Sequence, residues 1–463
     1  MGLFSSWKNK ETVLKKTISR CTQCKIPVTA EVFKKANGQK EEIIMRRVCP
    51  SHGTEEYVIS TDARFYWLAQ GNPKNKSCCG PEKSCCSSGG GKPGTLGKNA
   101  LNPDNQGVVE KLATCLALIE IVDSCNLACP TCFADSPMGV TDTHLKYHSV
   151  ENITSRIQGV IDRKGHIDLV QFSGGEPSIH PQLFELVEWV RKNPDIDYLI
   201  INTNGVRFAR DEAFVERMGE LFKKYDNIQL YLQFDGPQLD GQLELRGVDL
   251  RQLKKKAIEN CARFGLPITL AMTVNRTNLP HLWDTVQFGL QYDHIRGVSF
   301  QPMFGSGRLP KGFRQKTLPQ PITPADIILG LHEQSKSLVA LDDFTPLPCG
   351  DPNCATIGWL MRIGEKTLSP TAMGIDIAAL QADVPDKINY TIEDLRRCGC
   401  DGTLLGDLMR KMELQESNAF RLFIKPFMDA RTWDEDRIDR CCTHVIRPDG
   451  KLDSFCRYYF GSP

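Results

Sequence analysis

The stretch that decides the fold is Ile121-Val-Asp-Ser-Cys125-Asn-Leu-Ala-Cys129-Pro-Thr-Cys132-Phe133, which directly follows an apolar run typical of a buried strand. Three thiolates on one short loop can bind three irons of a cubane iron–sulfur cluster and leave the fourth iron without a protein ligand. A structural site would close that fourth position, so the spacing indicates an iron that is open to a substrate or cofactor. The alternative is part of a zinc site, although zinc modules usually pair two-cysteine knuckles.

The composition limits the class of protein. The chain has 463 residues, is 41% hydrophobic and carries a net charge of +1. This length allows about two or three domains, and the balanced charge gives no reason to expect a nucleic-acid partner. We expect no membrane span, because no apolar run reaches about 18 residues. Nineteen cysteines without a signal peptide indicate metal ligands in a reducing compartment, so we expect a cytoplasmic location.

Residues 1–70 predict a small metal-binding ribbon. Cys21 and Cys24 form a two-cysteine knuckle, and Cys49-Pro-Ser-His52 follows after two strand-like stretches at 26–33 and 42–48. Zinc or a single rubredoxin-like iron, bound by Cys21, Cys24, Cys49 and either His52 or a later cysteine, would replace the core that so short a segment cannot build. The alternative is a disulfide with a spare thiol.

Residues 71–108 have the composition of a mobile linker, rich in Gly, Ser, Lys and Pro. The linker contains four cysteines, Cys78, Cys79, Cys85 and Cys86. They would supply a ligand to the first module, hold a further metal or have no metal role, and the sequence leaves these alternatives open.

Between residues 109 and 310, strand patterns alternate with amphipathic helical patterns. The six predicted strands span 115–122, 167–172, 198–202, 228–234, 267–274 and 297–301. The five predicted helices span 150–164, 181–192, 211–224, 249–264 and 279–290. This alternation implies parallel strands with right-handed crossovers. It predicts an α/β fold, a partial (β/α)6 TIM-like barrel, with its ligand sites at the C-terminal ends of the strands.

Polar motifs follow several of these strands. Gly174-Gly175-Glu176 follows the second strand, Asn204-Gly follows the third and Asp235-Gly follows the fourth. Glycines let a ligand approach the backbone closely, and Glu176 offers a carboxylate. Turn or capping chemistry is the alternative for Asn204 and Asp235. Phe304-Gly-Ser-Gly-Arg308, after the sixth strand, would contact a ligand or form a plain loop.

Residues 311–463 form a cysteine-rich C-terminal region. Its seven cysteines are Cys349, Cys354, Cys398, Cys400, Cys441, Cys442 and Cys456. Four thiolates close one cubane cluster, so seven are one short of two clusters, and Cys115 or His444 would be the eighth ligand. One cluster with spare thiols, or buried cysteines without metal, are the alternatives. Cys261 lies in an apolar helical stripe and is predicted to be a core residue.

The cysteine loop and the Gly-Gly-Glu motif together resemble the radical S-adenosylmethionine (SAM) superfamily. One departure is Thr131, where that family usually has a hydrophobic or aromatic residue before the last cysteine. The resemblance implies a [4Fe-4S] cluster at Cys125, Cys129 and Cys132, whose open iron binds SAM. It also implies reductive cleavage of SAM to a 5′-deoxyadenosyl radical, which removes hydrogen from an unactivated carbon. The implied SAM contacts are Gly174, Gly175, Glu176, Asn204 and Asp235.

Nearly the full chain resembles one subgroup, the tetraether lipid synthases and the 7,8-dihydro-6-hydroxymethylpterin dimethyltransferases. This resemblance implies carbon–carbon bond formation or methylation of a lipid-chain or pterin-like substrate. It also implies one or two auxiliary [4Fe-4S] clusters and an electron donor such as ferredoxin or flavodoxin. A lipid substrate would require peripheral contact with a membrane. The alternatives are a peptide-modifying maturase with auxiliary clusters and a non-enzymatic iron–sulfur or zinc electron-transfer scaffold.

Overall fold

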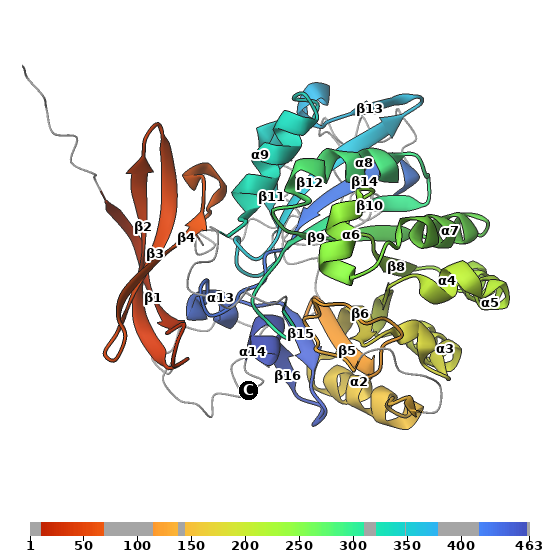
Figure 1. Cartoon of the computed structure of the whole chain (residues 1–463). Coiled ribbons are helices and arrows are strands. Elements are labelled where there is room, and N and C mark those ends of the chain that lie inside the picture. The colour runs from red at the N-terminus through yellow and green to blue at the C-terminus, as the bar shows by residue number, and fades with distance from the viewer. Residues whose placement is uncertain are drawn as a thin grey trace, which may run out of the picture.

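The computed structural model describes residues 11–68, 114–137, 144–309, 321–347, 349–377 and 416–460. The linker cysteines Cys78, Cys79, Cys85 and Cys86 lie outside the described residues, as do Cys398 and Cys400. Figure 1 shows a separate N-terminal sheet beside a larger barrel-like body of strands and helices.

The N-terminal sheet has four antiparallel strands in sequential order. They are β1 (Thr12–Arg20), β2 (Pro27–Asn37), β3 (Lys40–Cys49) and β4 (Gly53–Ser60). The two strands predicted from sequence correspond to β2 and β3, and β1 and β4 were missed because both are largely polar. Val32, Phe33 and Met45 are fully buried in this sheet, which gives the ribbon a small apolar core.

The larger sheet contains the six predicted parallel strands in sequential order. They are β5 (Leu116–Val122), β6 (Ile167–Gly174), β7 (Ile196–Thr203), β8 (Ile228–Gln233), β9 (Ile268–Val274) and β10 (Ile295–Pro302). The predicted helices are α2 (Val150–Lys164), α3 (Leu183–Lys192), α5 (Glu212–Lys224), α7 (Arg251–Ala262) and α8 (Leu282–Leu290). The predicted partial barrel is therefore confirmed, and α4 (Val206–Arg210) and α6 (Leu239–Arg246) are two short helices that sequence patterns missed.

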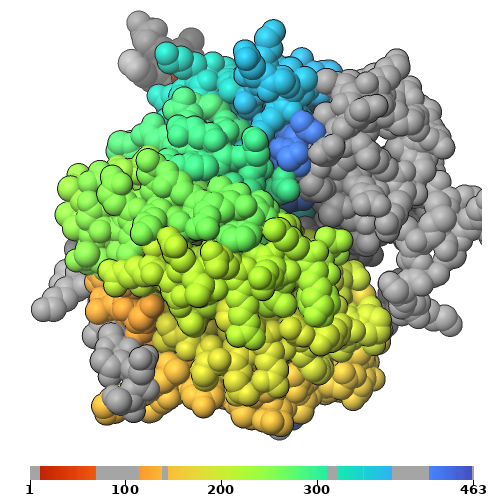
Figure 2. Space-filling view, turned by 90° about the vertical axis from the view of Figure 1, so that its right-hand side faces the viewer, coloured from red at the N-terminus to blue at the C-terminus, as the bar shows by residue number. Residues whose placement is uncertain are grey.

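These helices pack their apolar faces on the outside of the sheet. In α2, Ile153, Ile157 and Val160 recur at helical spacing and are fully buried, each contributing roughly 1.5–3 kcal/mol by burial. Cys261 is 1% exposed within the same apolar core, as predicted. Figure 2 shows the outer surface that the barrel helices and their loops form, coloured from yellow to green.

The C-terminal region extends both edges of the barrel sheet. The strands on the β10 side are β14 (Ala419–Ile424), β12 (Thr356–Ile363), β11 (Thr345–Pro346) and β13 (Lys366–Leu368). On the β5 side are β15 (Thr443–Ile446), parallel to β5, and β16 (Leu452–Ser454). The helices among the described residues of this region are α9 (Pro324–Gln334), α13 (Glu435–Asp439) and α14 (Phe455–Phe460). The cysteine-rich region thus shares the core sheet. Within the part of the chain that the structure describes, the helices are too short or too polar to cross a membrane.

Candidate active site and metal centres

The three cysteines of the loop after β5 face a cavity inside the barrel. Cys125, Cys129 and Cys132 line this cavity, whose volume is about 330 Å³. Burial raises the pKa of the Cys125 thiol to about 12, so an ionised sulfur here requires a positive partner such as iron. The donor set fits three corners of a cubane cluster with one corner left open.

The Gly-Gly-Glu motif at the end of β6 packs directly against the cysteine loop. The amide of Gly175 donates to the Val122 carbonyl at 2.7 Å. A β-carbon on Gly175 would lie 1.9 Å from the Ser124 carbonyl oxygen, and one on Gly174 would lie 2.1 Å from that of Val122. The approach of the cysteine loop therefore requires both glycines, and the predicted approach of a ligand to them stays a prediction. Both glycines line the cavity.

Glu176 presents a preorganised carboxylate to the same cavity. It is 1% exposed, and it accepts hydrogen bonds from the Thr203 hydroxyl at 2.7 Å and from the amide of Asn204 at 2.7 Å. Burial raises its pKa, while these hydrogen bonds oppose the rise. A carboxylate fixed in this way is suited to hold an ammonium group.

Asn204 connects the end of β7 to the cysteine loop. Its Nδ2 donates to Asn126 Oδ1 at 2.7 Å and lies 3.9 Å from Cys125 Sγ. The side chain lines the cavity. The predicted contact of Asn204 with a cofactor is therefore sterically open and stays a prediction.

Asp235 is fully buried after β8, with a left-handed backbone conformation at φ 62°. Its carboxylate pairs with Arg246 at 2.7 Å and 2.9 Å, and Lys254 Nζ lies 3.6 Å away. Arg246 lines the cavity, whereas Asp235 is absent from the lining. Direct contact of Asp235 with a cofactor stays a prediction, and the side chain presented to the cavity is Arg246. Sequence analysis missed Arg246 because no motif surrounds it.

The Phe304–Arg308 segment supports the cysteine loop from the other side. Cys132 and Arg308 exchange two backbone hydrogen bonds at 2.9 Å and 2.8 Å, and Arg308 Nε donates to the Cys129 carbonyl at 3.0 Å. Gly307, at φ 61°, lies so close that a β-carbon would be 2.3 Å from the Cys132 carbonyl oxygen. This segment therefore does more than connect elements, because it fixes the loop and lines the cavity with Phe304 and Arg308.

The cavity continues into the barrel and has two kinds of wall. The core strands contribute mostly neutral polar side chains that hydrogen-bond to one another, and the C-terminal region contributes aromatic side chains. The polar residues include Gln171, Asn202, Gln229, Tyr231, Ser299 and Gln301. The aromatic residues include Trp359, Phe423, Phe427 and Phe455, beside the buried ammonium of Lys425.

Cys115, Cys349 and Cys442 form a buried group whose sulfur atoms lie within 4.8 Å of one another. β15 pairs with β5, and this pairing brings Cys442 next to Cys115. Hydrogen bonds from the Cys115 and Cys349 thiols lower the pKa of Cys442 well below its usual range, so a thiolate is available for metal. Of the two residues proposed as an eighth ligand, Cys115 joins this group, whereas His444 Nδ1 lies 3.1 Å from the Thr114 hydroxyl.

Cys354, Cys441 and Cys456 gather in a second place. Their thiols interact electrostatically with one another and with Lys425. Burial raises the pKa of Cys456 to about 11, and its sulfur accepts a hydrogen bond from the amide of Met428 at 3.3 Å. Of the adjacent cysteines 441 and 442, Cys442 therefore joins Cys115 and Cys349 within 4.8 Å, whereas Cys441 interacts most strongly with Cys354 and Cys456. Whether either group binds an iron–sulfur cluster stays a prediction.

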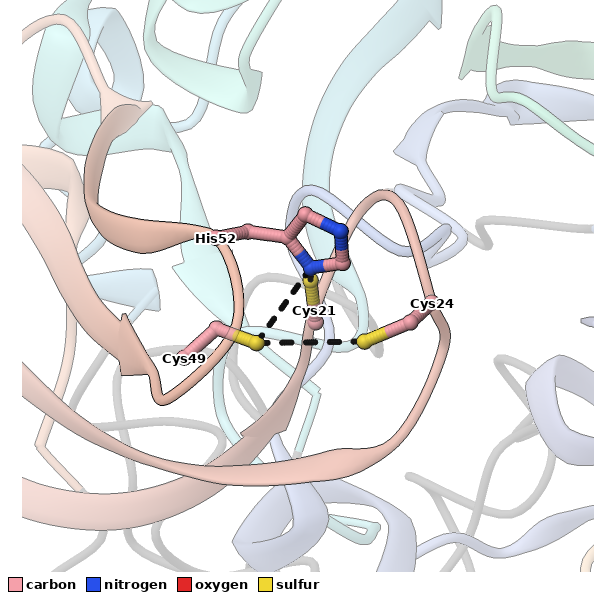
Figure 3. A group of neighbouring side chains, drawn as sticks. All are labelled: Cys21, Cys24, Cys49 and His52. Carbon is pink, nitrogen blue, oxygen red and sulfur yellow. Dashed lines mark hydrogen bonds between the residues drawn. The ribbon is translucent and has the colours of Figure 1, made fainter.

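The N-terminal site brings together the four predicted ligands Cys21, Cys24, Cys49 and His52, all within 4.8 Å of one another (Figure 3). His52 Nδ1 lies 3.4 Å from Cys21 Sγ and 3.5 Å from Cys49 Sγ. Burial opposes ionisation of Cys21, but hydrogen bonds from the backbone of Cys24 and Gln23 outweigh it and lower the pKa to about 6. Three thiols and one imidazole fit a tetrahedral zinc site.

Comparison with known proteins agrees with this geometry. Residues 119–289 match the family model of the radical SAM superfamily, and residues 13–61 match the HMPTM N-terminal zinc ribbon domain. The chain therefore carries a radical SAM domain behind a zinc ribbon, and the predicted resemblance to the radical SAM superfamily is confirmed.

Among individual proteins, the chain is 25% identical to the 7,8-dihydro-6-hydroxymethylpterin dimethyltransferase of Methanocaldococcus jannaschii, over 96% of this chain and 93% of that protein. It is 27% identical to the PqqA peptide cyclase of Granulibacter bethesdensis, over 60% of this chain and 72% of the relative. The structure of Streptococcus suis SuiB bound to S-adenosylmethionine covers 48% of this chain and 46% of SuiB, with 15% identity and a TM-score of 0.35.

Proposed function

We propose that the protein is a radical SAM enzyme that cleaves SAM reductively and removes hydrogen from an unactivated carbon, leading to carbon–carbon bond formation or methylation. When bound at Cys125, Cys129 and Cys132, a [4Fe-4S] cluster supplies the electron for that cleavage. The observation that carries the proposal is the convergence of these cysteines with Glu176 and Arg246 on one cavity.

In this proposal the polar residues around the cysteine loop hold SAM by its charged end. The Glu176 carboxylate accepts hydrogen bonds from the amino group of SAM. The Arg246 guanidinium, which is fixed by Asp235, pairs with the carboxylate of SAM. Gly174, Gly175 and Asn204 line the same part of the cavity. The enclosing barrel strands orient the substrate and exclude water from the reacting carbon.

The cavity lining supports a pterin-like substrate more than a lipid chain. Amides and hydroxyls of β6 to β10 line the inner wall among apolar side chains such as Leu169, Ile200 and Val298, and they offer a heterocycle donors and acceptors that a polymethylene chain could not use. The similarity to a pterin dimethyltransferase over nearly the whole chain supports the same substrate class. A ferredoxin- or flavodoxin-type donor in a reducing cytoplasm would supply the electrons.

Metal content and electron paramagnetic resonance of the anaerobically purified protein test the proposal. We expect about 8 to 12 irons per chain, at four per cubane, with zinc at the N-terminal site. A reduced-cluster signal should shift when SAM is added, and 5′-deoxyadenosine should form. Zinc alone, without a SAM-sensitive signal, would identify a zinc-stapled scaffold and overturn the proposal.

The role of Arg246 has a matched control on the next helix. Arg246→Met should weaken SAM binding by about 10–100-fold, because a charged pairing in a low-dielectric site is lost. Arg251→Met removes a partly exposed arginine whose ion-pair partner among the described residues is Asp249, at 2.9 Å, and this variant should bind SAM normally. Equal SAM affinity in both variants would refute the assignment.

Mass analysis after incubation with candidate substrates decides the substrate class. We expect methylated or coupled product from a dihydropterin and none from a lipid extract. A modified peptide would instead favour the maturase alternative, which the similarity to a peptide cyclase keeps as second candidate.

A further inference from the structure

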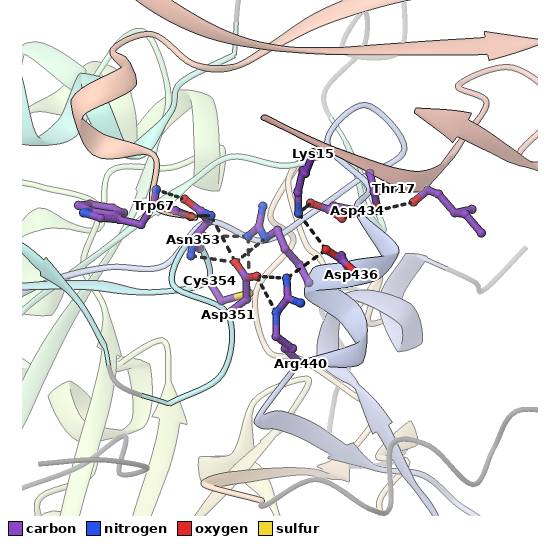
Figure 4. Close-up of polar contacts among 11 residues, drawn as sticks. Lys15, Thr17, Trp67, Asp351, Asn353, Cys354, Asp434, Asp436 and Arg440 are labelled. Atoms are coloured by element: carbon purple, nitrogen blue, oxygen red, sulfur yellow. Dashed lines mark hydrogen bonds and ion pairs between the residues drawn. The ribbon is translucent and has the colours of Figure 1, made fainter. Parts of the chain in front are cut away.

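The N-terminal ribbon contacts the core at a segment that we call the docking segment, residues 428–440. Lys15 Nζ lies 2.6 Å from Asp434 Oδ2, and the Thr17 hydroxyl donates to Asp434 Oδ1 at 2.7 Å (Figure 4). The side chain of Asp434 is only 2% exposed. β1 therefore neutralises a buried carboxylate of the docking segment, a carboxylate that would be costly to bury without this partner.

A second buried contact comes from β3. Arg47 is 1% exposed, and its guanidinium donates to the carbonyls of Ala430 and Arg431. Arg20 lies over the ring of Trp433, with its guanidinium carbon 5.4 Å from the ring centroid. Two arginines of the ribbon thus hold the backbone and an aromatic anchor of the same segment.

These arginines lie next to the ribbon's metal ligands in the sequence. Arg20 immediately precedes Cys21, and Arg47 lies two positions before Cys49. Because Cys21 and Cys49 belong to the group that also contains Cys24 and His52, a metal bound there fixes the ends of the strands that carry both arginines.

The other end of the docking segment leads into the auxiliary cysteines. Cys441 and Cys442 follow it directly. Its Arg440 pairs with Asp351 at 2.7 Å, and its Arg437 donates to the Asn353 carbonyl at 2.9 Å and lies 3.7 Å from Cys354 Sγ.

The ribbon end also holds the Cys349–Cys354 loop directly. The amide of Trp67 donates to Asn353 Oδ1 at 3.0 Å, and Asn353 Nδ2 donates to the Trp67 carbonyl at 2.6 Å. Among the described residues, the segment that carries Cys349 and Cys354 and the segment that precedes Cys441 and Cys442 are therefore both attached to the N-terminal module.

We propose that the metal-loaded ribbon is a positioning module for the auxiliary cysteines, with Lys15 and Arg47 as its positioning residues. Metal binding fixes Arg20 and Arg47, and these two arginines hold the docking segment. The docking segment in turn places Cys441 and Cys442 in their two groups. The inference rests on the proposed function only in that these groups bind metal. The cysteine loop of the core site has its own supports, the Arg308 backbone and the Gly-Gly-Glu motif. One hydrogen bond, from the amide of Gly305 to Asp429 at 2.8 Å, joins the docking segment to the segment around Arg308.

Lys15→Met and Arg47→Met in the full chain test the proposal, with Lys34→Met as control. Lys34 lies on the same ribbon but pairs with Glu41 at 2.8 Å and makes no contact with the docking segment. We measure iron per chain, the SAM-sensitive resonance signal, and alkylation rates of individual cysteines in the iron-free protein with zinc bound.

We expect Lys15→Met and Arg47→Met to expose Cys441 and Cys442 to alkylation about tenfold faster, as for a locally released segment. Iron should fall while the SAM-sensitive signal persists, and Lys15→Arg should restore both readouts. Cys24→Ser, which removes a ribbon ligand, should act in the same way. Unchanged alkylation and iron in all three variants would overturn the proposal, as would parallel loss of both cysteine regions through global unfolding. Wild-type protein without auxiliary iron would contradict the proposed function but leave the alkylation test valid.

Discussion

The two cysteine regions of the core differ in how the chain assembles them. Cys125, Cys129 and Cys132 lie on one loop, whereas Cys115, Cys349 and Cys442 come from three distant segments. The loop follows the C-terminal end of β5, and Cys115 precedes the N-terminal end of the same strand. Seven residues of strand, roughly 23 Å at 3.3 Å per residue, therefore separate a local site from a non-local one.

This difference teaches that the two regions have different structural requirements. The cysteine loop needs only its own spacing and the contacts of two neighbouring segments. The group of Cys115 and Cys442 forms where β15 pairs with β5, and there the amide of Leu116 donates to the Cys442 carbonyl at 3.2 Å. In our proposal it also depends on the docking segment. Perturbations should therefore separate the two regions, and the following experiments are ordered from the largest expected effect.

The largest effect is expected for Cys129→Ala. This variant removes one of three ligands from the local site, so SAM cleavage should fall to background. Absorbance from the auxiliary groups should largely remain, because their ligands lie at the other end of β5. The readouts are 5′-deoxyadenosine by chromatography and iron per chain. Full retention of cleavage would refute the assignment of the core site.

A large but indirect effect is expected for Gly175→Ala. Its β-carbon would lie 1.9 Å from the Ser124 carbonyl oxygen, so the cysteine loop must shift, and SAM cleavage should fall about 100-fold, as for other displacements of roughly 1 Å. Gly159→Ala is the control, because its β-carbon meets only the end of the Arg163 side chain at 3.4 Å in α2. That control should be neutral or stabilise the protein by about 0.5–1 kcal/mol in urea unfolding. Equal activity of both variants would show that the close packing is dispensable.

The same contrast explains what the sequence could and could not predict. The spacing of Cys125, Cys129 and Cys132, the Gly-Gly-Glu motif and the six strands were all evident, because each is encoded by neighbouring residues. The close packing of Gly175 was not predicted, since the backbone that approaches it belongs to a loop about 50 residues away in sequence. Arg246 was invisible because only tertiary packing brings it to the cavity.

For the auxiliary cysteines, the composition indicated metal ligands but did not indicate which cysteines share a site. Nothing in the Cys441-Cys442 doublet indicates that the two thiols serve different groups, because that division follows from β15 being buried between β5 and β16. The candidate eighth ligands Cys115 and His444 were equivalent by sequence, and strand register distinguishes them. Local chemistry is therefore readable from sequence here, whereas the partition of ligands requires the sheet topology.

The reverse experiment targets the non-local region. Cys456→Ala should lower the iron content and stop product formation, yet some uncoupled SAM cleavage should persist, because the cysteine loop keeps all its ligands. The resonance signal that responds to SAM is the readout that separates the two regions. Cys261→Ala is a control cysteine buried in the apolar core, and it should keep its iron. Unchanged iron in Cys456→Ala would contradict the ligand role of this residue.

The smallest effect concerns charge beside the cysteine loop. Lys254 is fully buried, and burial lowers its pKa from 10.5 to about 8, against the attraction of Asp235. Between pH 8 and 10.5 the unfolded chain binds more protons at this residue than the folded chain does, so the free energy of unfolding should rise with pH through that window. The gain is at most about 3.4 kcal/mol, at roughly 1.36 kcal/mol for each of the 2.5 pKa units.

Urea unfolding across this pH range should therefore show a rise in the wild type that Lys254→Met lacks. Lys255→Met is the matched control, because Lys255 is half exposed and pairs with Glu259 at 3.4 Å, and it should keep the wild-type slope. Identical slopes in all three proteins would show that Lys254 titrates normally. The iron content of the auxiliary groups should be the same in both variants, because Lys254 lies at the end of the barrel that holds the cysteine loop.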